Sequence, residues 1–352
     1  MPFSDLPPTA LRAYSPELVD PRDFDEFWAV TLAESRAVSG EIRLQQIEGE
    51  ITQLVVEDLT FPGFAGESIR AWVTRPLGGV EPLPTVIEYV GYGGGRGLPF
   101  ERIQWAAAGF VHILMDTRGQ GSNWGTGGDT PDPHGSGPAT HGVMTRGIES
   151  PGTYYYRRLF TDAVRLVDAA RTLDFVDADR VAVAGASQGG AITLAVAGLV
   201  PDLIAVMPDV PFLCDFHRSA TLTPSAPFTE LRTYLSVHRD RVAQTFTTLS
   251  YFDGVAFAKR ASAPGLFSVA FMDDIVLPSG LRRVQSLCER EADRRVRVQR
   301  PRGRAGASVA AAGRVAEADS RGVGFVRDRP SSVPLLEVVQ VLTAPILPPG
   351  GP

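Results

Sequence analysis

The chain has 352 residues, of which 44% are hydrophobic and 21% charged, a composition ordinary for a globular protein with one large core. Its formal net charge of -6 and pI near 5.5 argue against nucleic acid as the main partner. No basic region precedes an apolar run at the N-terminus, and no window approaches the ~18 apolar residues of a membrane span. We therefore expect a cytoplasmic protein that does not enter the membrane.

The first part of the chain predicts a helix followed by strands. Residues 22–37 carry aromatic and leucine side chains at helical spacing. Residues 51–61 and 68–76 alternate as two strands of a hairpin around the turn "PGFAGE". Residues 84–90 and 110–116 are short apolar runs on either side of a helical stretch, which is the strand–helix–strand unit of a parallel sheet.

A long loop and further alternating elements follow. Residues 117–152 are rich in Gly, Pro, Asp and Thr, and a loop of this length inside a compact domain is usually functional or an insertion. Residues 153–174 predict a strong helix whose early residues, Tyr154–Arg158, are expected on its outer face or at a contact. The later predicted elements are the strand "RVAVAG", the helix "GGAITLAVAGLV", the strands "LIAVMPDVPF" and "PGLFSVAFMDD", and a helical excursion at 225–260. This alternation predicts an α/β fold with a doubly wound, mostly parallel sheet and helices on both faces.

The pattern Gly-x-Ser-x-Gly at residues 185–189 predicts a sharp strand-to-helix turn that presents Ser187 as a nucleophile. Glycines two residues before and two after the serine avoid clashes in the strained turn. The backbone N–H of Gln188 then points into the site at the helix N-terminus. The alternative is a purely structural turn, which the flanking strand and helix disfavour.

Two further groups complete part of a hydrolytic site. The loop Gly91–Gly97 follows a strand in the position where such hydrolases present a second oxyanion donor, which we assign to the Tyr92 N–H. A phosphate cradle is disfavoured because no Gly-Lys-Ser/Thr sequence ends this loop. Asp273 or Asp274, at the end of a later strand, is the candidate acid that orients a base.

The histidine base is missing from its expected place. In this class of fold the order along the chain is Ser, then Asp, then His, and no histidine follows Asp273. His112 lies in an apolar strand and reads as a buried structural residue, and the other histidines read as loop or out-of-order residues. These four are His134, His141, His217 and His238. The triad is therefore incomplete as written.

Several motifs together resemble the acetyl xylan esterase / cephalosporin-C deacetylase family, carbohydrate esterase family 7. They are "FDEFW", "GYGGGRG", "DTRGQGSNW", "YYYRRLFTDAVRLVDAAR", "GASQGG", "PDVPFLCDF" and "FSVAFMDD", spread over about residues 1–279. The resemblance implies an α/β-hydrolase that removes acetyl groups from xylo-oligosaccharides, other small acetylated sugars and cephalosporin C.

The resemblance also implies roles for individual residues. Ser187 would be the nucleophile, Asp273 the triad acid, and the amides of Tyr92 and Gln188 the oxyanion hole. Trp105 and Trp124 match aromatic positions near the acyl pocket, and Arg118 matches a structural position that holds loops near the site. The resemblance implies a ring-like homohexamer. We expect neither a metal nor a cofactor. Cys214 and Cys288 show no metal-ligand spacing and are expected to be plain thiols.

The C-terminal part departs from this pattern. We divide the chain into a hydrolase domain, residues 1–279, and a tail, residues 280–352, rich in Arg, Ala, Gly and Pro. The family's His-Glu pair, about 30 residues after the acid, is replaced by "VRVQRPRGRAG". We hypothesise an out-of-frame tail, so the last strand and helix are expected to be missing or disrupted. The alternatives to an active esterase are a catalytically impaired member of the family and, more weakly, a binding protein that uses the tail.

Overall fold

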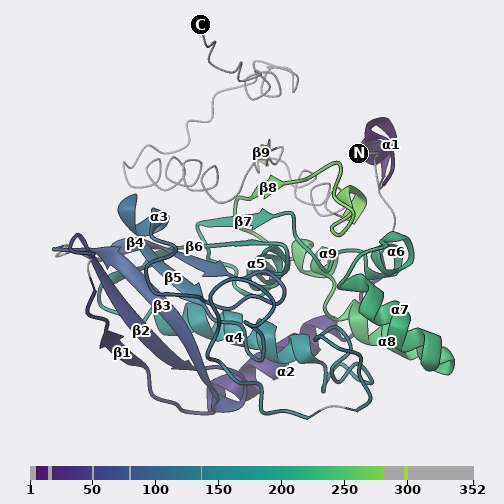
Figure 1. The fold of residues 1–352 in the computed structure, drawn as a ribbon, viewed down its shortest axis with the longest axis horizontal. Helices are drawn as coiled ribbons and strands as arrows, with labels where there is room; N and C mark the ends of the chain where they lie inside the picture. The colour runs from purple at the N-terminus through teal and green to yellow at the C-terminus, as the bar shows by residue number, and fades with distance from the viewer. Residues whose placement is uncertain are drawn as a thin grey trace, which may run out of the picture. The chain divides into compact units, whose positions relative to one another are not determined.

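A central β-sheet organises the protein (Figure 1). The computed structural model describes residues 5–14, 18–49, 51–78, 81–135, 137–280 and 297–299. Within these residues the sheet has nine strands in the order β1-β2-β3-β5-β4-β6-β7-β8-β9. The pairings β4–β5, β4–β6, β6–β7, β7–β8 and β8–β9 are parallel. The predicted α/β-hydrolase architecture, a doubly wound and mostly parallel sheet, is therefore confirmed.

The strands range in length from three residues in β8 and β9 to eleven in β6. Their bounds are β1 Arg43–Gln46, β2 Leu54–Pro62, β3 Ser68–Pro76, β4 Leu83–Tyr89, β5 Val111–Met115, β6 Val176–Ala186, β7 Ala205–Asp209, β8 Leu266–Ser268 and β9 Arg297–Gln299.

The helices fall into two groups, those that pack on the sheet and those of the excursion before β8. The helices of the first group are α2 Phe24–Ala37, α3 Gln104–Ala107, α4 Tyr155–Ala170 and α5 Gln188–Leu199. Those of the excursion are α6 Phe216–Leu222, α7 Phe228–Val237, α8 Val242–Ser250 and α9 Gly254–Ala258. The short helix α1, Pro8–Ala13, precedes both groups, and the 3-10 turns are Phe64–Gly66 and Arg239–Arg241.

The predicted hairpin forms the antiparallel edge of the sheet. β2 and β3 pair in continuous register from Leu54 opposite Pro76 to Pro62 opposite Ser68. β1 extends this edge by pairing with β2. The sequence "RLQQ" of β1 gave no strand signal, because the strand is mostly exposed and carries no alternating apolar pattern.

Side-chain alternation in the parallel strands divides the core between the two faces of the sheet. In β6, Val181 and Val183 belong to the large cluster that also contains α2, α4 and α5. Ala182 and Ala184 belong to a smaller cluster with Trp105 of α3. Because successive strand residues point to opposite faces, a continuous apolar run is required when both faces are covered.

One prediction about α4 is wrong for its tyrosines. Tyr154, Tyr155 and Tyr156 were expected on the outer face or at a contact, and all three are fully buried. Burial is possible because each hydroxyl group has a partner: the Met144 carbonyl at 3.0 Å, the Arg118 carbonyl at 2.6 Å and the Gln188 Oε1 atom at 3.0 Å, respectively.

The end of the sheet bears on the expected loss of the last strand. β9 pairs in parallel with β8 over three residues, from Leu266 opposite Arg297 to Ser268 opposite Gln299. The chain thus keeps a short strand where the sequence predicts a missing or disrupted one. The boundary at residue 279 stays a prediction. The expected loss of the final helix and the tail, apart from residues 280 and 297–299, lie outside the described residues.

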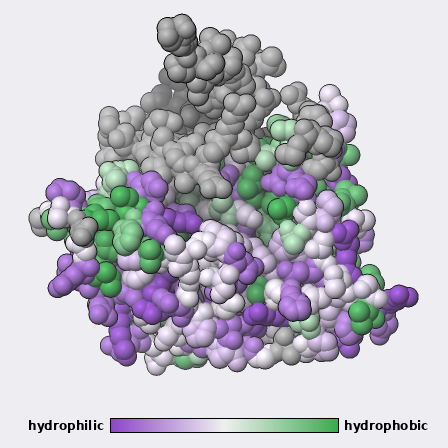
Figure 2. All heavy atoms as spheres, viewed as in Figure 1, coloured by the Kyte–Doolittle hydropathy of each residue, from purple (hydrophilic) through white to green (hydrophobic). Residues whose placement is uncertain are grey.

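The surface in Figure 2 is mostly hydrophilic, with apolar side chains gathered beside α3. The exposed large apolar residues include Leu77, Leu98, Phe100 and Trp124. Among the described residues no helix combines the length and the apolar character that crossing a membrane requires.

Candidate active site

The segments with predicted chemistry leave the sheet at the carboxyl ends of neighbouring strands. β4 leads into the loop 91–97, and β6 leads into Ser187. β7 is followed by residues 210–215, and β8 by the segment with Asp273. Because these strands are parallel, their carboxyl ends meet at one edge of the sheet, where open α/β sheets place their sites.

The turn from β6 to α5 has the geometry of a nucleophile elbow. Ser187 lies between the strand and the helix with φ 56° and ψ -116°, a strained conformation for a residue with a side chain. A Cβ atom at Gly185 would lie 2.5 Å from the backbone of Gly189, and one at Gly189 would overlap the Tyr89 carbonyl oxygen. Both glycines of the motif are therefore required by close backbone packing, as the sequence pattern predicts.

The peptide groups around Ser187 are held by the segment after β7. The Ser187 N–H donates to the Asp209 carbonyl at 2.9 Å, and the Phe212 N–H donates to the Ser187 carbonyl at 3.0 Å. Val210 and Leu213 in this segment have positive φ values of 37° and 60°. Strained residues thus occur both at Ser187 and in the segment bonded to it, and such strain often clusters at functional sites.

The glycine-rich loop after β4 lies against the elbow. A Cβ atom built on Gly91 would lie 4.0 Å from the Ser187 Cβ atom and 3.6 Å from the Ala186 carbonyl oxygen. No acceptor among the described residues takes the N–H of the next residue, Tyr92. Gln188 is the first residue of α5, so its N–H belongs to the helix end whose donors have no intrahelical partner.

Two side chains restrain Tyr92 from different directions. Trp124 donates its indole N–H to the Tyr92 carbonyl at 2.6 Å, with 46% of the tryptophan exposed. The Tyr92 hydroxyl donates to Glu230 of α7 at 2.6 Å. Burial, followed by the charge of Glu230, raises the pKa of Tyr92, so the phenol stays protonated as a donor. Burial also raises the pKa of Glu230 despite its hydrogen bonds from Tyr92 and the Met144 N–H.

Gln120 connects the loop after β4 to the helix after Ser187. Its Oε1 atom accepts the Gly93 N–H at 2.5 Å, and its Nε2 atom donates to the Gln188 Oε1 atom at 3.0 Å. The same Nε2 atom lies 2.9 Å from the Tyr155 hydroxyl, and Gln188 also accepts from Tyr156. This partly buried network fixes two backbone segments relative to each other.

Arg118 is the centre of a buried ion-pair network behind Gln120. Its fully buried guanidinium contacts Asp162 at 2.6 Å, Glu67 at 2.6 Å and Asp132 at 3.3 Å. Burial, only partly offset by Arg118, raises the pKa of the fully buried Asp162. Arg158 adds a second positive charge at Asp132, 2.7 Å away. These contacts agree with the structural role that the family resemblance implies for Arg118.

The two candidate acids differ in their partners. The Asp273 Oδ1 atom accepts the N–H groups of Ile275 and Val276, each at 2.9 Å. The Asp274 Oδ2 atom accepts the hydroxyl of Ser225 at 2.9 Å, which ties it to the segment before α7. Asp273 therefore organises its own loop, while Asp274 connects that loop to the helical excursion.

His112 has partners that explain its position without catalysis. It is buried on β5, with its Nε2 atom 3.0 Å from Glu88 Oε2 and its Nδ1 atom 2.9 Å from the Arg102 carbonyl. Burial raises the pKa of Glu88, but His112 and Arg102 outweigh this effect and hold it below its usual range. The prediction of a buried structural histidine is thus confirmed.

The remaining histidines are distributed over the loop and the helical excursion. His134 pairs with Glu67 at 2.8 Å. The ring of His217 lies 4.8 Å from that of Phe246, and the ring of His238 lies 4.4 Å from that of Tyr234. His141 is exposed on the long loop.

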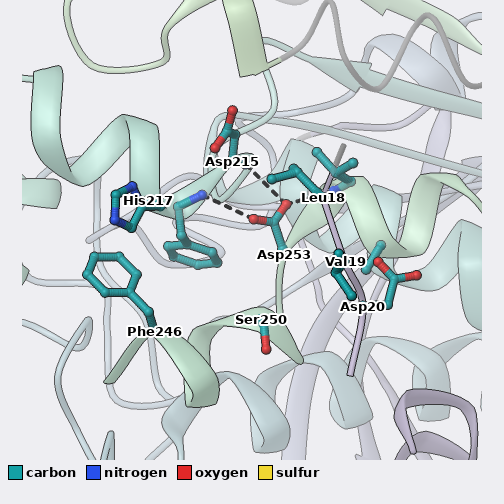
Figure 3. Close-up of a pocket in the computed structure, with 11 residues that line it drawn as sticks. Leu18, Val19, Asp20, Asp215, His217, Phe246, Ser250 and Asp253 are labelled. Atoms are coloured by element: carbon teal, nitrogen blue, oxygen red, sulfur yellow. Dashed lines mark hydrogen bonds between the residues drawn. The ribbon is translucent and has the colours of Figure 1, made fainter. Parts of the chain in front are cut away.

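The His217 ring lines a pocket between the segment 18–20 and the helical excursion, shown in Figure 3. Asp253 also lines this pocket and accepts the N–H groups of Asp215, Phe216 and Val255 at 2.9–3.1 Å. Burial raises the pKa of Asp253 to about 6. The carboxylate caps the N-termini of α6 and α9, so it serves the packing of these helices.

The two tryptophans predicted near the acyl pocket lie in different surroundings. Trp124 lies over the loop 91–97, as its bond to the Tyr92 carbonyl shows. Trp105 is 3% exposed and packs against Phe110 with 5.7 Å between ring centroids, in the smaller core cluster. The involvement of Trp105 in a pocket remains a prediction.

Among the described residues there is no group of three or more His, Cys, Asp or Glu side chains that could hold a metal ion. Cys214 is a free, buried cysteine, and burial raises the pKa of its thiol well above the ordinary value. Cys288 lies outside the described residues.

The sheet and the elbow at its carboxyl edge define an α/β-hydrolase with a serine at the nucleophile position. A family model described as acetyl xylan esterase (AXE1) matches residues 1–293. The chain belongs to this family of carboxylic ester hydrolases.

Individual relatives agree with the family. The acetyl esterase Axe7A of Xylanibacter ruminicola is 26% identical over 283 residues, which are 76% of this chain and 61% of that protein. The chain thus spans about three fifths of the length of this curated relative. An acetyl xylan esterase from Paenibacillus sp. R4 has a TM-score of 0.82 and 32% identity, over 89% of this chain and 99% of that one. Acetyl xylan esterase 1 from Thermoanaerobacterium sp. JW/SL YS485 has a TM-score of 0.80 and 30% identity, with the same coverage.

Proposed function

We propose that the protein is a serine esterase that removes acetyl groups from small acetylated sugars such as xylo-oligosaccharides, and from cephalosporin C. The strained Ser187 elbow beside the Gly91–Tyr92 peptide is the observation that carries this proposal. The names of the relatives, acetyl esterase and acetyl xylan esterase, support the acetyl group and the sugar as substrate features.

In this mechanism the Ser187 Oγ atom attacks the acetyl carbonyl carbon and gives up its proton. The N–H groups of Tyr92 and Gln188 stabilise the negative charge that develops on the carbonyl oxygen. The C–O bond to the sugar breaks, the sugar oxygen takes a proton, and an acetyl-Ser187 ester remains. Water then attacks this ester, which releases acetate and restores the serine. Asp273 would be the acid that orients the base.

The proton from Ser187 needs an acceptor, and the histidine content of the chain makes this step the weak one. All 5 histidines are at or before residue 238. His112 pairs with Glu88 and His134 with Glu67, and neither carboxylate belongs to the elbow sequence 185–189. This observation favours a second candidate, a family member with impaired catalysis. Such a protein would keep the oxyanion hole and lose most of the base-assisted rate.

The remaining parts of the proposal concern partners. We expect no cofactor and neither nucleic acid nor a membrane as partner. We also expect a cytoplasmic location and a homohexamer, as the family resemblance implies. A binding protein that uses the arginine-rich residues 280–352 is the weakest alternative, because Asp and Glu are interspersed among the arginines.

The decisive assay is p-nitrophenyl acetate hydrolysis by the purified chain, compared with Ser187→Ala. Ser262→Ala is the matched control, because the hydroxyl of this exposed serine donates to a surface carbonyl, that of Pro201. An active esterase gives turnover that Ser187→Ala abolishes and Ser262→Ala retains. Equal rates for the chain and Ser187→Ala would refute the active esterase.

Added imidazole separates an active esterase from an impaired one. If the base is missing, imidazole supplies a proton acceptor in solution and raises the Ser187-dependent rate, measured as the difference between the chain and Ser187→Ala. A Ser187-dependent rate that is already high and does not respond to imidazole would rule out the impaired enzyme.

A further inference from the structure

Glu230 is a partly buried contact between the helical excursion and the loop next to Ser187. It lies on α7, and its Oε1 atom accepts the Tyr92 hydroxyl at 2.6 Å. Its Oε2 atom accepts the Met144 N–H at 3.1 Å. Both carboxylate oxygens are therefore used to connect α7, the loop after β4 and the long loop.

The Tyr92 hydroxyl is held on a second side as well. It accepts the Val143 N–H at 2.7 Å while it donates to Glu230. Gly142, with φ 97°, makes this arrangement possible, because a Cβ atom there would overlap the Glu230 carboxylate oxygens. A phenol with a donor and an acceptor in fixed positions has one orientation.

The orientation of the ring bears directly on the backbone of Tyr92. Trp124 fixes the carbonyl group of this residue, and Glu230 fixes the far end of its side chain. The ring also packs at 6.3 Å from Phe212, whose N–H bonds to the Ser187 carbonyl. With both ends of the residue held, the peptide N–H of Tyr92 cannot rotate freely relative to the elbow.

We propose that Glu230 is a positioning residue: through the Tyr92 phenol it sets the direction of the Tyr92 N–H, so that α7 controls the oxyanion hole. The inference rests on the proposed function for its catalytic consequence. The restraint on the loop 91–97, however, is a property of the fold that is measurable without turnover.

The test compares Tyr92→Phe, Glu230→Gln, Glu230→Ala and the double variant Tyr92→Phe/Glu230→Ala in the full chain. Tyr234→Phe is the control, because Tyr234 is a buried tyrosine on the same helix whose hydroxyl contacts Arg241 instead. Hydrogen exchange, followed by mass spectrometry, measures the amides of residues 91–97. Kinetics with p-nitrophenyl acetate give kcat and KM.

We expect Tyr92→Phe and Glu230→Ala to speed exchange in residues 91–97 about tenfold, and Tyr234→Phe to leave it unchanged. Tyr92→Phe and Glu230→Ala each lower kcat on the order of tenfold with KM within about twofold, less than the loss from deleting an oxyanion donor. Glu230→Gln, which keeps one acceptor, retains more activity than Glu230→Ala. The double variant is no worse than the poorer single variant, because both changes break the same connection.

Two results would overturn the inference. One is wild-type exchange in residues 91–97 for both Tyr92→Phe and Glu230→Ala. The other is a double variant whose losses multiply, which would mean that the two side chains act independently. If the chain shows no Ser187-dependent turnover, the proposed function fails, and the exchange measurement alone decides the positioning role.

Discussion

Replacement of Arg118 by methionine tests whether the buried ion pairs behind the site stabilise the fold as their geometry implies. Methionine keeps much of the aliphatic volume of arginine but removes the charge. Asp162, which has no exposed surface, then loses contacts of 2.6 and 2.8 Å to the guanidinium. Removal of one partner of a buried pair leaves an uncompensated charge and typically costs about 3–5 kcal/mol. Such a loss is a large part of the roughly 5–15 kcal/mol by which a typical domain is stable.

Urea unfolding, followed by tryptophan fluorescence, measures this loss. Arg36→Met is the matched control, because Arg36 and Asp168 form a pair at 2.9 Å with side chains 46% and 29% exposed. An exposed pair contributes about 0–1 kcal/mol. We expect the addition of Asp162→Asn to Arg118→Met to recover part of the stability, since the amide keeps an acceptor for the Phe64 N–H.

The pH dependence of the Arg118→Met loss has a definite sign. Burial already raises the pKa of Asp162, and loss of Arg118 raises it further. A carboxyl group whose folded pKa is raised carries a penalty that is full above the folded pKa and is lost as the pH falls from the folded pKa to the unfolded one. The Arg118→Met loss therefore shrinks on acidification. A loss below about 1 kcal/mol at neutral pH, or no recovery with Asp162→Asn, would refute the reasoning.

Three further predictions concern the elbow, the helical excursion and the network at Gln120. Gly189→Ala places a Cβ atom against the Tyr89 carbonyl, so it is expected to lower the free energy of unfolding by several kcal/mol, measured in urea. A variant as stable as wild type would contradict the conclusion that this position requires glycine. Asp253→Asn removes a carboxyl group whose pKa burial raises to about 6. Because of the raised pKa, ionisation of Asp253 destabilises the wild-type fold increasingly from about pH 4 to 6. Over this window the stability of the variant relative to wild type should therefore improve by on the order of 3 kcal/mol. A stability difference that does not change with pH would exclude the raised pKa of Asp253. Gln120→Ala removes the hydrogen-bond partner of the Gly93 N–H and of Gln188, and it should lower the free energy of unfolding by about 1–3 kcal/mol. Hydrogen exchange in the loop 91–97 should be faster, and unchanged exchange would show that Gln120 does not restrain that loop.

Local patterns in the sequence predicted most of the sheet and the strained turn at Ser187. The alternating apolar runs around residues 54–76 correspond to the antiparallel hairpin of β2 and β3. The motif around Ser187 predicted a strained turn, and the residue has positive φ there. These predictions succeed because strand periodicity and glycine spacing depend on backbone geometry within a few residues.

The surroundings of the site could not be predicted in the same way. The three tyrosines at the start of α4 are polar enough to suggest exposure, but partners distant in sequence satisfy their hydroxyls and allow burial. Glu230 is one carboxylate on an ordinary helix, so nothing in its local pattern marks a contact with Tyr92, 138 residues away. The sequence indicated Gln120 only as part of the motif "DTRGQGSNW" and did not predict its contacts with Gly93 and Gln188.

The sequence by itself determined the class of fold, the elbow with Ser187 and the absence of a histidine after Asp273, because each of these depends on residue identity and order. Only the tertiary structure decided how the loop 91–97 is held against the elbow. The reason is physical: a hydrogen bond depends on the distance and direction between two groups, and chain folding brings Glu230 to Tyr92 and Gln120 to Gln188 from segments that no local pattern connects.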